Sequence, residues 1–181
     1  MIGQIHPSAA GLLGGGRSEA DLLPYPYVAF WRVDGLTLAD PVIDRKEISG
    51  SLPAVLQRLD EIASANVPVS TSLLSGAVER SLSDYPLEAL RQLLRNAVLH
   101  RDYETSTAPI QWFWFADRIE LHNPRVLASK AHRHGVGLTR AESACAQNGN
   151  PPLELLLQPK HFAVILRARR SDRPLPSRNE D

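Results

Sequence analysis

The segment from Leu87 to Arg101 constrains the fold most, because it combines helical periodicity with chemically different faces. Asp84 and Pro86 are typical start signals of a helix. At about 100° per residue, an apolar face separates from a charged one. The apolar face holds Leu87, Leu90, Leu94, Ala97 and Val98, and the charged face holds Glu88, Arg91 and Arg95. The pattern predicts a helix with one side on a core and another in water.

A third strip of the same helix carries Gln92, Asn96 and His100, spaced one turn apart, with Ala89 and Leu93 beside them. One interpretation is a half-exposed polar surface. The other is a strip that shows amide oxygens and an imidazole to a cleft. Because Mg²⁺ prefers hard oxygen ligands, such a strip could hold a cation that carries phosphates. Periodicity alone leaves both interpretations open.

The segments after this helix predict a layer of strands and helices. Ala116-Asp117 separates two strand-like runs, which indicates a hairpin, and Gly149 is placed to cap a helix. The expected elements are strands at Ile110–Phe115 (IQWFWF), Arg118–His122 (RIELH) and Phe162–Leu166 (FAVIL), and a helix at Thr139–Asn148. Helices on one face of a sheet give an α+β fold.

The aromatic residues of the first of these strands have two interpretations. Trp112, Phe113, Trp114 and Phe115 could stack on single-stranded bases, or they could be sandwiched between layers. No basic residues are interleaved with them, which favours a core position.

Residues 1–83 predict a small α/β segment that precedes the second unit, residues 84–169. Aromatic and β-branched residues at Tyr27–Asp34 indicate a strand, and leucines at helical intervals after Ser51 indicate an amphipathic helix that ends near Asn66. Shorter extended pieces are expected at Pro41–Ile48 and Val67–Leu74. The glycine run at residues 14–16 lacks the spacing and the lysine of a phosphate-binding P-loop, so a turn is expected there.

Composition narrows the classes of function. The 181 residues, 43% of them hydrophobic, suit roughly one domain, and 20 basic residues balance 20 acidic ones. The chain alone therefore lacks the positive field that draws proteins to DNA. The only cysteine, Cys145, excludes an internal disulfide. No apolar run reaches the ~18 residues that span a bilayer, so we expect no membrane partner and a cytoplasmic location, with residues 170–181 as a disordered tail.

Two blocks of the second unit resemble the C-terminal ATP-binding module of a prokaryotic family. They are YPLEALRQLLRNAVLHRDY (Tyr85–Tyr103) and PIQWFWFADRIELHNP (Pro109–Pro124). Members of that family are described as divergent-AAA or RecG-helicase-like ATP-binding proteins, and often as transcriptional regulators. The resemblance extends through His134–Leu155 to the FAVIL strand, and Leu22–Glu61 is similar to the family's central segment. It implies a GHKL (Bergerat)-like helix-on-sheet sandwich. At most the closing edge of the family's N-terminal DNA-binding domain could lie in residues 8–35, so the chain resembles a truncated member.

The resemblance assigns roles to the polar strip. In the Bergerat fold, a glutamate activates water, and an asparagine four residues later holds Mg²⁺. Asn96 matches the asparagine, His100 lies one turn beyond it on the cofactor side, and Gln92 occupies the position of the glutamate. An amide cannot take a proton at neutral pH, and general-base catalysis typically contributes ~10² to 10⁴ in rate. Hydrolysis of ATP is therefore expected to be weak or absent.

Two further family boxes also contribute implied contacts to ATP. The box that contacts adenine is usually Asn-Pro-Gly-Gly, and here Asn123 and Pro124 are followed by Arg125 and Val126. The box that meets phosphate matches Gly135 and Gly137, whose small size lets backbone N–H groups approach the ligand at a helix start. Only ten residues, 125–134, separate the two boxes, so the lid over the triphosphate is expected to be nearly absent.

Two other motif interpretations fail. His100-Arg101-Asp102 begins like a kinase catalytic loop, but Thr107 stands where the metal-binding asparagine would be. His132 and His134, with His122 nearby, lack a matching set of ligands at a known metal spacing, which favours an exposed basic loop.

The first functional hypothesis is therefore an ATP- and Mg²⁺-binding regulatory module that reaches DNA only through a missing domain or a partner. The alternative is an interaction or structural fragment that keeps the fold and binds no nucleotide. Loss of both glycines after Pro124 favours the alternative, and retention of Asn96 with Gly135 and Gly137 favours the first. Homo-oligomerisation stays open.

Overall fold

The computed structural model describes residues 27–67, 69–71, 81–101, 106–124, 136–158 and 161–169. Six strands form one mixed sheet in the order β2-β1-β5-β6-β8-β7, and two short strands, β3 and β4, pair separately. The strands are β1 (Val28–Val33), β2 (Val42–Ile48), β3 (Val69–Thr71), β4 (Ser81–Ser83), β5 (Ile110–Trp114), β6 (Arg118–Asn123), β7 (Glu154–Gln158) and β8 (His161–Arg167). The helices are α1 (Leu52–Asn66), α2 (Leu87–Leu99) and α3 (Val136–Asn148).

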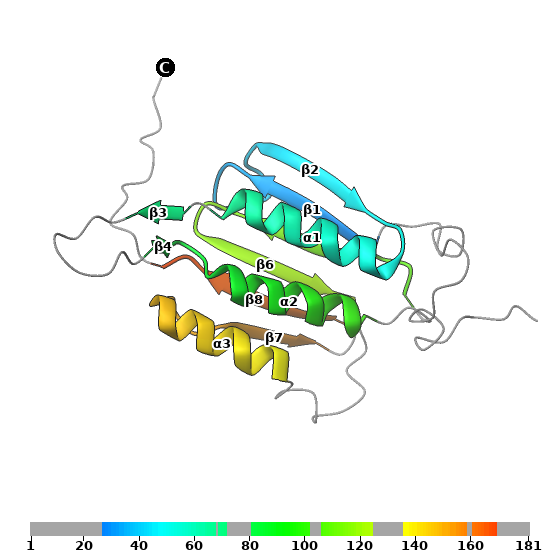
Figure 1. Ribbon diagram of the computed structural model, residues 1–181. Coiled ribbons are helices and arrows are strands. Elements are labelled where there is room, and N and C mark those ends of the chain that lie inside the picture. The colour runs from blue at the N-terminus through cyan, green and yellow to red at the C-terminus, as the bar shows by residue number, and fades with distance from the viewer. Residues whose placement is uncertain are drawn as a thin grey trace, which may run out of the picture.

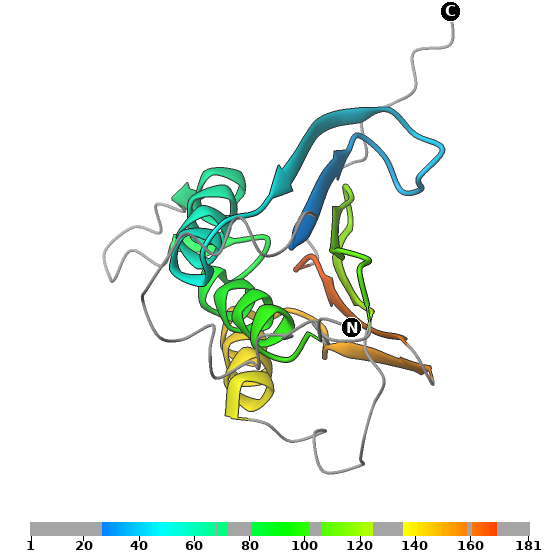
Figure 2. The same cartoon turned by 90° about the vertical axis from the view of Figure 1, so that its right-hand side faces the viewer.

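The described elements form two layers. The three helices lie side by side on one face of the six-stranded sheet, and α2 is the middle one (Figures 1 and 2). The other face of the sheet carries no helix among the described residues. This arrangement confirms the expected α+β fold with helices on one face. The sheet joins strands from both sides of residue 83, because β1 pairs in parallel with β5.

The core lies between the helices and the sheet. Alternate residues of each strand point to opposite faces, so Phe30, Trp112 and Leu121 project toward the helices. The rings of Phe30 and Trp112 are 4.6 Å apart between centroids. The aromatic residues at 112–115 are all buried, which confirms the expected core position. On the helix-free face, a second and smaller apolar cluster joins Val33, Phe113 and Phe115, with Trp31 packed against it.

Local signals in the sequence explain the start of α1 and the end of α3. Pro53 near the start of α1 matches the preference of proline for the first helical turn. Gly149 has a φ of 81° directly after α3, and the backbone N–H groups of Gly149 and Asn150 donate to Ala146 and Cys145. This is the Schellman arrangement, in which a left-handed glycine lets the last carbonyls of a helix find donors.

An asparagine pair then ties the end of α3 to its neighbours. Asn150 is buried, and its Nδ2 donates to the carbonyls of Asp84 at 2.8 Å and Arg167 at 3.0 Å. Asn148 donates to Asn150 Oδ1 and to the carbonyl of Ser83. The pair thereby connects α3, the entry to α2 and the end of β8.

Several sequence predictions need correction. The helix expected from Leu87 to Arg101 ends at Leu99, and the helix expected from Thr139 begins at Val136. Strands β4 and β7 were not expected. On α2, Leu87 is only partly buried, whereas Ala89 and Leu93 are fully buried. The physical reason is the central place of α2, because flanking helices on both sides widen the sector that water cannot reach.

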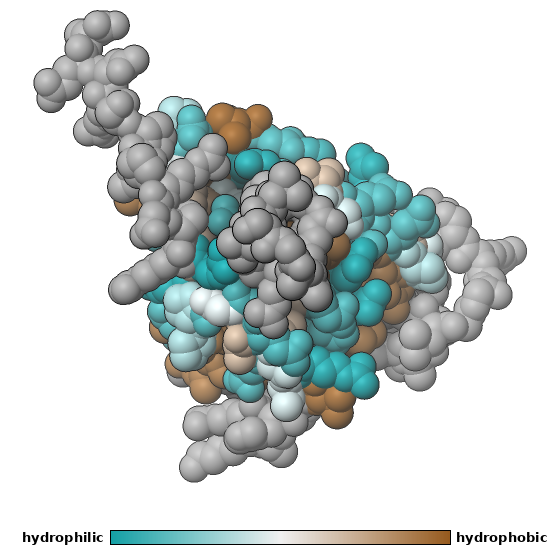
Figure 3. All heavy atoms as spheres, turned by 60° about the vertical axis from the view of Figure 1, so that its left-hand side comes forward, coloured by the Kyte–Doolittle hydropathy of each residue, from teal (hydrophilic) through white to brown (hydrophobic). Residues whose placement is uncertain are grey.

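The surface seen from the side in Figure 3 mixes hydrophilic and hydrophobic residues, and its apolar areas are separate from one another. The two edges of the large sheet are β2 and β7. On β2, side chains of opposite charge two residues apart form ion pairs along the strand, Arg45 with Glu47 and Lys46 with Asp44. Charged side chains on an edge strand oppose pairing with other chains.

Candidate functional site

The candidate site lies where the polar strip of α2 meets the first turn of α3. Gln92 and Asn96 are half-buried on α2, and His100 is exposed at its C-terminal end. The backbone N–H of His100 donates to the carbonyl of Asn96 at 3.1 Å, which closes the last turn. The strip is therefore neither core nor free surface, as its sequence pattern indicates.

Gly137 brings α3 close to this strip. A β-carbon built on Gly137 would lie 3.2 Å from Oδ1 of Asn96 and 3.7 Å from Oε1 of Gln92. The first distance is shorter than an ordinary contact, so a larger residue would force the Asn96 side chain to move. Glycine is favoured here by this close approach and not by its backbone conformation, because its φ is not positive. Two amide oxygens thus converge on the start of a helix.

The start of a helix has a chemistry of its own. The first backbone N–H groups of a helix have no acceptors within it, and the helix dipole makes this end partly positive. The amide oxygens of Gln92 and Asn96 carry partial negative charge, so they complement the first turn of α3. The same set of donors and acceptors suits an anion together with a hard cation.

Glu88 also belongs to this polar strip, although the sequence pattern did not place it there. Nε2 of Gln92 donates to Oε1 of Glu88, one turn earlier on α2, at 2.6 Å. The helical wheel groups Glu88 with the solvent-facing charges, and its side chain is indeed exposed. The spacing of four residues between Glu88 and Gln92 could have indicated this contact, because side chains one helical turn apart are neighbours. This hydrogen bond occupies the amide nitrogen of Gln92, and the amide oxygen is the end that lies near Gly137.

Asn123 is fully buried at the end of β6 and holds the last turn of α2. Its Nδ2 donates to the carbonyl of Ala97 at 2.8 Å. That carbonyl belongs to the four at a helix end that have no intrahelical donor, so the asparagine caps the helix from the sheet. Among the residues that the structure describes, Oδ1 of Asn123 has no hydrogen-bond partner. A buried acceptor in that state costs roughly 1 to 3 kcal/mol.

The candidate residues therefore divide into two groups around α2. Gln92, Asn96 and Gly137 meet on the side that faces α3, and Asn123 lies beneath the last turn. Gly135, His132 and His134 fall outside the described residues. Arg101, which follows the helix in the family signature, is buried, and its Nη2 donates to the carbonyl of Ala108 at 2.9 Å.

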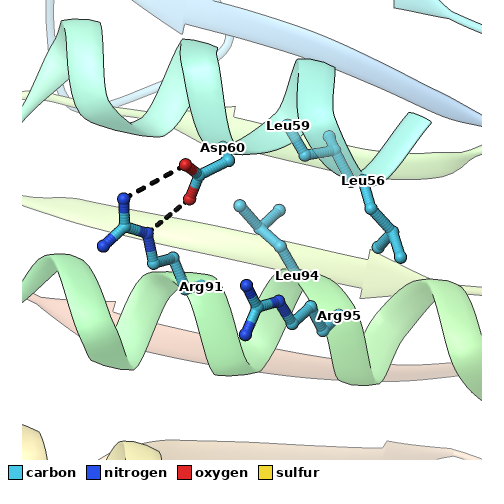
Figure 4. A pocket seen from close by; sticks show the side chains of 6 residues that line it. All are labelled: Leu56, Leu59, Asp60, Arg91, Leu94 and Arg95. Atoms are coloured by element: carbon cyan, nitrogen blue, oxygen red, sulfur yellow. Dashed lines mark hydrogen bonds and ion pairs between the residues drawn. The ribbon is translucent and has the colours of Figure 1, made fainter. Parts of the chain in front are cut away.

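A shallow groove follows the opposite side of α2, between α1 and α2 (Figure 4). Its floor is apolar, with Leu56, Leu59 and Leu94, and Arg95 lies at its rim. Arg91 grips both carboxylate oxygens of Asp60, and this hydrogen bonding lowers the pKa of Asp60. The ion pair joins the two helices across the groove.

The fold and this arrangement define a class: a two-layer α+β protein whose middle helix carries a polar strip against the start of the next helix. One solved structure of the same fold is the DIP2311 protein from Corynebacterium diphtheriae. It is 18% identical over 82% of this chain and 36% of that chain, with a TM-score of 0.65. The likeness speaks for the fold alone, and the chain spans about a third of that protein.

Other comparisons and searches give no match. No protein-family model matches the sequence, and the search of curated proteins finds no relative. Within the described ranges, no group of three or more His, Cys, Asp or Glu side chains could hold a metal ion. In the same ranges, no helix is long and apolar enough to cross a membrane.

Proposed function

We propose that this chain is a nucleotide-binding regulatory module of GHKL (Bergerat) type, with weak or absent hydrolysis. The observation that carries the proposal is the convergence of Gln92 and Asn96 on Gly137. The sequence resemblance implies that these residues belong to one phosphate and Mg²⁺ site, although they come from two elements that lie far apart in the sequence. ATP with Mg²⁺ is the proposed ligand.

The residues at this site have the chemical groups that ATP with Mg²⁺ needs. Asn96 would hold Mg²⁺ through Oδ1, and the first turn of α3 would present backbone N–H groups to phosphate. Mg²⁺ would neutralise phosphate charge when bound. By the family resemblance, Asn123 would lie beneath the base, where it holds the last turn of α2 in place through the Ala97 carbonyl. His100 lies one turn beyond Asn96 and would extend the polar strip.

The weakness of hydrolysis follows from Gln92. Its amide cannot take a proton from water, and its nitrogen is already bonded to Glu88. Glu88 is a carboxylate, but its exposed position on the solvent side of α2 leaves it without the protected setting of a general base. The module would therefore bind nucleotide without consuming it, so that its bound state depends on the nucleotide concentration. Contact with DNA would come through another domain or a partner.

A second candidate function rests on a specific observation. The near-contact between Gly137 and Asn96 leaves little room, and Asn123 already serves as a cap for α2. Both facts favour a fragment in which these residues only pack helices and strands together. Such a chain would act as an interaction or structural module without nucleotide.

Titration calorimetry with a non-hydrolysable ATP analogue and Mg²⁺ separates the two functions. We expect binding by the full chain, its loss in Asn96→Ala, and its weakening in Gly137→Ala, because the added methyl group would press on Asn96. Gln147→Ala is the matched control, since it removes an exposed amide elsewhere on a helix. Hydrolysis should appear, if binding holds, when Gln92→Glu restores a carboxylate.

Two outcomes would refute the proposal. One is a folded chain that binds no nucleotide, which leaves the structural fragment. The other is binding that Asn96→Ala and Gln147→Ala leave equally intact, which would place the ligand elsewhere.

A further inference from the structure

His122 and His161 meet on the helix-free face of the sheet. Nδ1 of His122 lies 3.0 Å from Nε2 of His161, on the neighbouring strands β6 and β8. Because strand residues alternate between faces and Asn123 points toward α2, its neighbour His122 points away from the helices. The histidine pair is therefore separated from the proposed nucleotide site by the sheet itself.

Glu120 determines which ring nitrogen of His122 carries the proton. Its Oε2 lies 2.7 Å from Nε2 of His122, and its Oε1 accepts a hydrogen bond from Nε of Arg118 at 2.5 Å. An ionised carboxylate only accepts, so Nε2 of His122 must carry the proton. In the neutral imidazole, Nδ1 of His122 is then a bare lone pair directed at His161.

We propose that His122 and His161 are the two protein ligands of a divalent transition-metal site, with Glu120 as the positioning residue and water in the remaining positions. A carboxylate that holds the far N–H of a ligating histidine is the usual outer partner in metal sites. Here that partner is already in place. His161 must change tautomer, so that its proton sits on Nδ1 and Nε2 becomes the second lone pair.

The geometry selects among metals. With metal–nitrogen bonds of about 2.05 Å, nitrogens 3.0 Å apart subtend about 94° at the ion. That angle is close to the right angle of square-planar or octahedral ions such as Cu²⁺ and Ni²⁺. A tetrahedral Zn²⁺ site would need the nitrogens to separate to roughly 3.3 Å. The ring centroids are 5.1 Å apart and the rings are inclined by 31°, so His161 must turn for both lone pairs to converge.

The surroundings keep the ligands available. Phe113 packs edge-on against His122, with centroids 5.5 Å apart, and limits its rotation. Arg118 holds the second oxygen of Glu120 and so keeps this carboxylate in position.

Cu²⁺ and Ni²⁺ added to the full, untagged chain test the proposal. We expect one equivalent of Cu²⁺ to bind with the nitrogen hyperfine pattern of two imidazoles in its electron paramagnetic resonance spectrum. Either His122→Gln or His161→Gln should abolish that pattern. Glu120→Gln should keep two nitrogens but weaken binding about ten- to a hundredfold, because the outer hydrogen bond loses its charge. In competition, Cu²⁺ should bind more tightly than Ni²⁺ or Zn²⁺.

The control is the double variant His132→Gln with His134→Gln, which removes the other two closely spaced histidines. It should bind Cu²⁺ as the wild type does. If a ligand variant fails to fold, nitrogen-15 spectra of the wild-type imidazoles give the same answer, because bound Cu²⁺ should broaden the His122 and His161 signals first. Absence of the two-nitrogen pattern, or its loss in the control double variant alone, overturns the proposal.

Discussion

Replacing the buried amide of Asn123 by a carboxylate tests how β6 holds α2. Asn123→Asp keeps the shape of the side chain but puts an acceptor where Nδ2 donates to the Ala97 carbonyl at 2.8 Å. The side chain is 0% exposed, so water cannot solvate the new charge. Removing one partner of a buried polar contact and leaving a charge unpaired costs about 3 to 5 kcal/mol. The ordinary net value of a hydrogen bond, about 1 kcal/mol, is much smaller.

The sign of the pH dependence follows from the same burial. Desolvation raises the pKa of the introduced carboxyl in the folded protein above the ~3.9 of an unfolded aspartate. Between the two values the folded state binds more protons than the unfolded chain. The stability of the variant relative to wild type therefore increases as the pH falls through the raised pKa, and it levels off below about 4. In acid the protonated carboxyl can donate to the Ala97 carbonyl again.

Urea denaturation of both proteins at neutral and mildly acidic pH gives the difference in unfolding free energy. Gln158→Glu is the matched control, because it makes the same chemical change at an exposed position of β7. Its effect should stay within about 0.5 kcal/mol. A variant as stable as wild type at pH 7, or a deficit that does not shrink in acid, would refute the capping role of Asn123.

Three further predictions concern other parts of the fold. Gly149→Ala should destabilise the protein by about 1 kcal/mol, because a φ of 81° is strained for alanine; an unchanged denaturation midpoint would contradict this. Asp60→Asn should cost less than about 1 kcal/mol, since the ion pair with Arg91 is more than a third exposed on the Asp60 side. Because the pKa of Asp60 is lowered, that contribution is present above the pKa of an unfolded aspartate and is lost as the pH falls through the folded value. Cys145 is buried with its pKa raised to about 11, so a thiol reagent should modify it only on unfolding, and rapid labelling of the native chain would contradict its position.

Local patterns in the sequence were sufficient for the helices and the hairpin. The leucine spacing after Ser51 and the proline at the start of α1 mark a helix that the structure places at Leu52–Asn66. The hairpin of β5 and β6 lies within one residue of its expected bounds, because both strands are short runs on either side of a tight turn. The end of α3 could be predicted from Gly149 alone, because glycine readily takes a positive φ.

Strand pairing over long distances could not be predicted from such patterns. Strand β7 (ELLLQ) is partly exposed at the sheet edge and shows no clean alternation, so nothing local distinguishes it from a loop. The parallel pairing of β1 with β5 joins strands that lie far apart in the sequence, and no local pattern records it. Ala89 and Leu93 are buried because of neighbours that one helical wheel does not contain.

The candidate sites show the same division. Gln92 and Asn96 could be placed on one strip from their spacing, and their nearness to Gly137 was implied only by the family resemblance. His122 was considered with His132 and His134, which are close in sequence. The structure brings it next to His161 on the neighbouring strand β8, whereas His132 and His134 lie outside the described residues. Spacing in the sequence could not indicate this contact, because the sheet register decides which side chains meet.

The parallel junction between β1 and β5 has a consequence for how folding can be observed. The chain has three tryptophans, and all lie on these two strands: Trp31 on β1, and Trp112 and Trp114 on β5. Each strand can first form a local antiparallel hairpin, β1 with β2 and β5 with β6. The junction must then close over a long stretch of chain, and contacts of that kind form slowly. The change in tryptophan fluorescence during refolding therefore gives the rate of the step in which the two hairpins join into one sheet.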